Sequence, residues 1–143
     1  MVKSLVTFAA AVIVMSAGTA SAQQCLHGAN EAPEQALRRK EALTATRALN
    51  TLQANHAGSR GGQYARHDEL LATAYAQTMK SSSNETTRKI FLAPLGDILP
   101  GWKLTLDVSQ DGYWYMIKDT TDPCGFAFVG TQEGLIYTAQ PLR

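Results

Sequence analysis

The sequence has little charge and no excess of either sign. Charged residues make up 17% of the 143 residues, and the formal net charge is +1. A nucleic-acid-binding domain normally carries a clustered excess of Lys and Arg, and so does a polybasic membrane anchor. We expect neither class here. General disorder is also excluded, because hydrophobic residues reach 45% of the chain.

Catalytic motifs of diagnostic spacing are missing. The sequence contains no GxSxG, HExxH or Walker string. His27, His56 and His67 form no HxxxH pair, and we expect each to be an ordinary surface or helix residue rather than a zinc ligand. We therefore expect a protein that is not an enzyme and holds no metal or cofactor. The alternative is a set of catalytic residues dispersed in the sequence that meet only in the fold.

Long apolar runs are absent except near the N-terminus. Lys3 precedes the uncharged run Leu5–Met15, and small residues then lead to Ala22. This order is typical of a secretory signal peptide cleaved after Ala22. The apolar run is about half of the ~20 residues that span a bilayer. We expect a cleaved signal over 1–22 and a single domain over 23–143, periplasmic or secreted, with no membrane span after cleavage.

Cysteine is scarce, with Cys25 and Cys124 alone. An even count in an exported chain favours a disulfide, and two cysteines allow one pairing. The bond would close a loop of about 100 residues, which the chain-entropy account values at about 4.7 kcal/mol. A catalytic thiol or a metal ligand is the competing interpretation, but no histidine has a spacing that favours it.

Helix formers dominate the first half of the expected domain. The segment 31–55 is rich in Ala, Leu, Glu, Arg and Gln, and its apolar residues gather on one side at helical spacing. Glycines over 56–63 indicate a break. A second helix is expected over Asp68–Met79, with Asp68 as its N-cap. The polar run 81–87 is expected to be a loop, and the apolar segment 89–99 a covering loop with at most a short strand.

From Trp102 onward the hydrophobic period changes to two, which indicates strands. Asp111-Gly112 is typical of a tight hairpin turn. Helices followed by strands predict an α+β fold, in which the N-terminal helix and a second short helix pack on a four-stranded antiparallel meander. The expected strands are 102–108, 113–118, 124–129 and 135–139.

Large side chains alternate along the second expected strand. Tyr113 and Tyr115 fall on one face, and Trp114 falls on the other. One set is expected to enter the core and the other to remain exposed. We take Tyr113, Trp114 and Tyr115 as a candidate binding surface for a peptide, a glycan or a neighbouring subunit.

Three short phrases resemble the soluble part of type IV pilin-like and pseudopilin-like proteins. They are Ala48–Gln53 on the first helix, Gly62–Ala65 followed by Leu70-Leu71, and Gly134–Tyr137 near the end. The resemblance spans most of 31–139 and implies a pilin-like soluble fold with an interaction role in the cell envelope. The leader ending in Gly and the long apolar helix of pilins are not matched, so the resemblance does not imply a polymerising subunit.

These patterns lead to two functional hypotheses. The first is an exported non-catalytic pilin-like domain that binds an envelope or secretion-system protein, with no nucleic acid among its partners. The alternative is a periplasmic small-ligand or inhibitor module that uses the aromatic sheet face.

Overall fold

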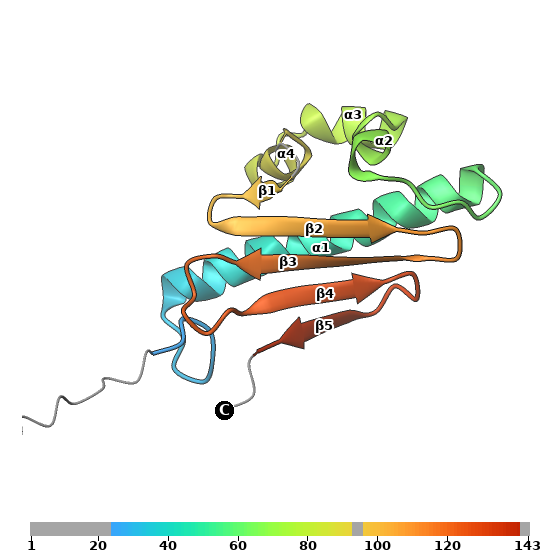
Figure 1. Ribbon diagram of the computed structural model, residues 1–143. Helices are drawn as coiled ribbons and strands as arrows, with labels where there is room; N and C mark the ends of the chain where they lie inside the picture. Colours follow the sequence, from blue (N-terminus) through green and yellow to red (C-terminus); the bar gives the residue numbers. More distant parts are fainter. Residues whose placement is uncertain (1–23, 93–95, 141–143) are drawn as a thin grey trace, which may run out of the picture.

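One long helix and one antiparallel sheet form the main layers of the fold (Figure 1). The computed structural model describes residues 24–92 and 96–140. The predicted signal peptide lies outside the described residues and stays a prediction. The helices are α1 (Pro33–Ser59), α2 (His67–Leu71), α3 (Ala74–Lys80) and α4 (Glu85–Leu92); the strands are β1 (Asp97–Leu99), β2 (Trp102–Val108), β3 (Tyr113–Asp119), β4 (Ala127–Thr131) and β5 (Ile136–Ala139).

The sheet is a meander in which every strand pairs with its neighbour in the sequence, so the predicted α+β class is confirmed. The predicted number of strands is wrong, because β1 adds a fifth strand at one edge. Pro94 and Gly96 interrupt the apolar pattern that would have indicated it. The strand forms because Ile98 and Leu99 are buried in the core, and because Leu104 N–H donates to the Gly96 carbonyl.

The second predicted helix is in fact two short helices. Thr73 interrupts it by serving as the N-cap of α3, where its hydroxyl accepts from the backbone N–H of Ala76 at 3.2 Å. The polar run predicted as a loop contains the start of α4. There Asn84 Oδ1 accepts from Thr87 N–H, and the helix buries Ile90 and Phe91. In Figure 1, α2, α3 and α4 lie beyond the β1 edge of the sheet.

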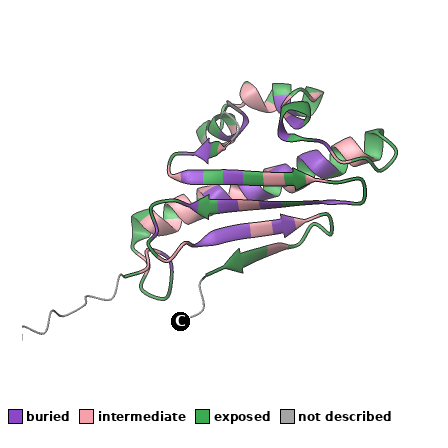
Figure 2. Ribbon diagram, in the orientation of Figure 1, coloured by how far each residue is buried: buried purple, intermediate pink, exposed green. Residues whose placement is uncertain are grey.

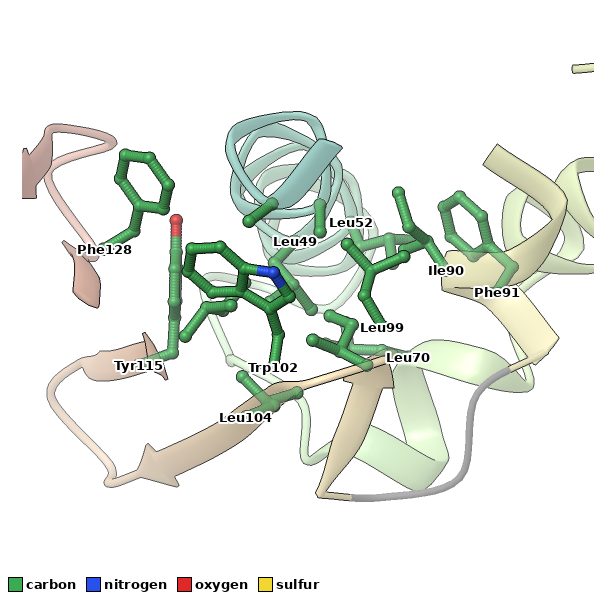
Figure 3. Close-up of a cluster of buried hydrophobic side chains, with 14 of the residues drawn as sticks. Leu49, Leu52, Leu70, Ile90, Phe91, Leu99, Trp102, Leu104, Tyr115 and Phe128 are labelled. Carbon is green, nitrogen blue, oxygen red and sulfur yellow. The ribbon is translucent and has the colours of Figure 1, made fainter. Parts of the chain in front are cut away.

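A stripe of small and branched residues on α1 packs against one face of the sheet. Ala42, Ala45, Leu49 and Leu52 are buried there, and the small alanines let the helix approach the strands closely. Figure 3 shows Leu49 and Leu52 facing a cluster from the strands and from α2 and α4. Its labelled members are Leu70, Ile90, Phe91, Leu99, Trp102, Leu104, Tyr115 and Phe128.

Among the residues that the structure describes, no helix lies over the opposite face of the sheet. Burial alternates along β2 and β3 (Figure 2). The buried set faces α1, since Tyr115 bonds to the Thr46 carbonyl there. We call this second surface the outer face: Thr105 and Asp107 of β2, Trp114 and Met116 of β3, Val129 and Thr131 of β4, and Tyr137 of β5.

Candidate functional site

The aromatic run of β3 divides between the two faces of the sheet. Tyr115 is fully buried and its hydroxyl donates to the Thr46 carbonyl of α1 at 3.0 Å, while Tyr113 Oη lies 3.2 Å from Asn50 Oδ1. Burial raises the pKa of Tyr113 to about 12 and raises the pKa of Tyr115 further. Two of the three residues of the candidate binding surface are therefore core residues, because α1 covers their side of the sheet.

Trp114 is the member of that run that reaches the solvent, with 41% of its surface exposed on the outer face. Asp107 lies directly opposite on β2, and the indole Nε1–H donates to its Oδ2 at 3.2 Å. This hydrogen bond fixes the orientation of the ring while leaving much of it in contact with water.

A hollow of about 230 Å³ adjoins Trp114 at the β2–β3 turn. The side chain of Gln132 lies over Gly112, where a Cβ atom would come within 3.0 Å of it. A larger residue at position 112 would displace the end of the Gln132 side chain. The hollow is lined by Asp107, Ser109, Asp111, Gly112, Tyr113, Trp114 and Gln132.

Apolar side chains continue from Trp114 across the outer face to the β5 edge. Met116 and Val129 are half-buried and lie opposite each other, and Val129 lies opposite Tyr137, which is 50% exposed. The charged residues Lys103 and Lys118 pair across β2 and β3 at the far end of the strands, with Asp97 opposite Lys103 on β1. The outer face thus has an uncharged centre between two charged ends.

A separate cluster of charged side chains is buried at the end of β3. His27 is only 2% exposed; its Nδ1 lies 2.5 Å from Glu31 Oε1 and its Nε2 lies 2.9 Å from Asp119 Oδ2. Arg39 holds Glu31 through three hydrogen bonds, and Arg38 Nη2 reaches Asp119 Oδ1 at 3.3 Å. The prediction that His27 is an ordinary surface or helix residue is therefore wrong.

The pKa values of the two carboxyl groups in this cluster are lowered. Hydrogen bonds from Arg39 lower the pKa of Glu31, with a further contribution from His27. Burial alone would raise the pKa of Asp119, but hydrogen bonds from Thr121 and His27 outweigh it. Both nitrogens of His27 contact carboxylates, one on Glu31 and one on Asp119. The cluster therefore anchors the N-terminal segment to the end of β3.

The predicted disulfide is confirmed, and it lies beside this cluster. Cys25 and Cys124 are bonded, with their Cα atoms 5.2 Å apart. The buried Asp122 shapes the loop around the bond, because its carboxylate accepts from the backbone N–H groups of Leu26, Cys124 and Phe126. No local pattern in the sequence reveals this role, because Leu26 lies 96 positions from Asp122.

Residues far apart in the sequence also meet along α1. Asn50 Nδ2 donates to the Gly134 carbonyl at 3.0 Å, at the β4–β5 turn. Gln53 makes two hydrogen bonds with the backbone of Ala65, at 2.7 and 2.9 Å. The phrases Ala48–Gln53, Gly62–Ala65 and Gly134–Tyr137 of the sequence analysis are therefore joined through α1.

Over 24–92 and 96–140 there is no group of three His, Cys, Asp or Glu side chains arranged to hold a metal ion. In the same ranges no helix combines the length and the apolar character needed to cross a bilayer.

Comparison of the chain with protein-family models, with curated proteins and with solved structures found no match. The outer face around Trp114 is therefore identified as the candidate site from its own geometry: an exposed aromatic ring, a hollow beside it and an apolar strip that leads to the sheet edge.

Proposed function

We propose that the protein is an exported, non-catalytic, pilin-like interaction domain that binds another protein of the cell envelope or of a secretion system. The observation that carries the proposal is the exposure of Trp114 and Tyr137 on the outer face of the sheet. Exposed tryptophan and tyrosine on a flat surface are the side chains that most often dominate protein–protein binding.

Other features support the same proposal. The low net charge suits a protein partner better than a nucleic acid. The disulfide suits an oxidising compartment such as the periplasm. The hydrogen bonds of Asn50 with Gly134 and of Gln53 with Ala65 join the three phrases of the pilin-like resemblance through α1.

The test is capture of partners from native envelope with three forms of the tagged protein: the wild type, Trp114→Ala and Leu37→Ala. Leu37 is a matched control, because it is a 59% exposed apolar residue on α1, away from the outer face. We expect an envelope or secretion-system protein to be retained by the wild type and by Leu37→Ala and to be lost with Trp114→Ala. If the Trp114→Ala variant still retains the captured protein, the outer face is not the docking surface.

The hollow beside Trp114 favours one alternative, a small-ligand or inhibitor module that uses the same aromatic surface. Trp102, the other tryptophan, is 2% exposed, so a ligand-induced change of fluorescence would report on Trp114. Under this alternative, free sugars or lipid fragments change the fluorescence and no protein is captured. Under the main proposal, the captured protein changes the Trp114 fluorescence and free ligands leave it unchanged.

A further inference from the structure

We propose that the hollow beside Trp114 receives a single arginine side chain from the partner. This inference rests on the proposed function and adds the chemistry of the contact to it. Three properties of the site carry it: the negative charge of its rim, the position of the Trp114 ring, and its size.

The rim of the hollow carries two acidic side chains, Asp107 and Asp111. Asp107 accepts only the indole N–H of Trp114, and Asp111 lies on the β2–β3 turn. Within the described residues no cation pairs with either carboxylate. The nearest lysine along β3, Lys118, lies four residues from Trp114, about 13 Å along an extended strand. A basic ligand group would supply the missing countercharge.

The Trp114 ring is placed to bind that group through its face. Its N–H is already used by Asp107, so the polar edge is satisfied and the exposed part of the ring is apolar. A guanidinium stacks on such a face while its N–H groups bond to a neighbouring carboxylate. Lysine presents a compact charge that does neither as well, which favours arginine as the occupant.

The size of the hollow limits the occupant to one side chain. Pockets for small-molecule ligands are commonly about 300–1,000 Å³. The hollow at Trp114 is about 230 Å³ and is open to solvent along the outer face. A protruding side chain fits these dimensions, with the rest of the partner lying over Met116, Val129 and Tyr137.

The experiment titrates the full mature protein with three capped tripeptides: Val-Arg-Val, Val-citrulline-Val and Val-Lys-Val. Citrulline has nearly the shape of arginine without its charge. Binding is followed by NMR through the indole N–H resonance of Trp114, with that of the buried Trp102 as an internal control. We expect saturable shifts of the Trp114 resonance alone, with citrulline about tenfold weaker than arginine and lysine in between.

Matched variants locate the contact. Asp107→Asn keeps an acceptor for the Trp114 indole but removes the charge, and Asp111→Asn removes the second charge. Asp97→Asn is the control, because it makes the same change at the other charged end of the sheet. We expect each of the first two to weaken binding of Val-Arg-Val several-fold and the control to leave it unchanged.

Equal binding of the arginine and citrulline peptides, or no shift of the Trp114 resonance with any peptide, would overturn the inference. So would equal effects of the Asp97 and Asp107 variants. The proposed function fails separately: if an envelope protein is captured through Trp114 and the two Asp→Asn changes at the hollow leave that capture intact, then the docking surface stands and the arginine contact is rejected.

Discussion

At the scale of single residues, the best-defined interaction is the position of His27 between two carboxylates. Its Nδ1 lies 2.5 Å from Glu31 Oε1 and its Nε2 lies 2.9 Å from Asp119 Oδ2. Phe126 lies against the ring, with centroids 4.6 Å apart. Polar groups are tolerated in such surroundings because each of them has a hydrogen-bond partner.

Replacing His27 removes one partner from each of the two carboxylates, while Arg39 still holds Glu31 and Arg38 still reaches Asp119. We expect His27→Ala to lower the free energy of unfolding by about 3 kcal/mol, because it removes two hydrogen bonds to charged groups, each worth about 1.5–3 kcal/mol. Urea denaturation of the oxidised protein measures the change. His56→Ala is the control, because its side chain makes no hydrogen bond or ion pair within the described residues, and it should cost less than 1 kcal/mol, roughly. A similar loss for both would show that the His27 contacts contribute little.

The same cluster predicts how stability depends on pH. The pKa values of Glu31 and Asp119 are lowered in the folded protein from ordinary values of 4.5 and 3.8. The unfolded chain then binds more protons than the folded one in acid, so the free energy of unfolding is maintained above about pH 4.5 and falls as the pH drops below it. Denaturation curves between pH 6 and pH 3 test this. Glu31→Gln should reduce the slope of the free energy of unfolding against pH. An unchanged slope would show that Glu31 does not contribute to the loss of stability in acid.

At the scale of elements, a hydroxyl group decides whether residues 67–80 form one helix or two. Thr73 ends the continuity by accepting the N–H of Ala76. We expect Thr73→Ala to lower the free energy of unfolding by about 1 kcal/mol, the usual value of an N-cap. Thr44→Ala is the matched control, because the Thr44 hydroxyl bonds only to the Lys40 carbonyl within α1. Equal effects of the two changes would mean that the cap is not important.

The sequence predicted the long elements well but missed the short helices and strand β1. The first helix and the strand 102–108 were predictable because many residues repeat one period, and the structure has them as α1 and β2. Helices α2, α3 and α4 have eight residues or fewer, which is too short for a period to be recognised. Strand β1 depends on its contact with β2, which no local pattern reveals.

The candidate site was predictable only in part, for a related reason. The alternation along β3 separates Trp114 from its two tyrosine neighbours, but it does not say which face a helix covers. That depends on α1, whose contacts with Tyr113 and Tyr115 are long-range. The pairing of Trp114 with Asp107 depends on the hairpin register, and the partners of His27 lie up to 92 positions away in the sequence.

At the scale of the whole molecule, the disulfide and the buried cluster around His27 both attach the N-terminal segment to the end of β3 and the loop after it. Cys25 joins the start of the described chain to the loop after β3, and His27 joins it to Asp119 at the end of that strand. The bond closes a separation of 99 residues. On the chain-entropy account a loop of this length is worth about 4.7 kcal/mol, and measured losses of native disulfides are about 2–5 kcal/mol.

Because both links hold one segment, their effects should not be additive. We expect Cys25→Ser with Cys124→Ser to lower the free energy of unfolding by about 2–5 kcal/mol. Once the bond is gone the segment can detach, and His27→Ala should then cost at least 0.5 kcal/mol less, roughly, than it does in the oxidised protein. Urea denaturation of the wild type, the serine variant, His27→Ala and the combination measures the coupling. If the two losses of free energy add up, the His27 contacts form without the disulfide. The disulfide and the His27 contacts then anchor the N-terminal segment independently.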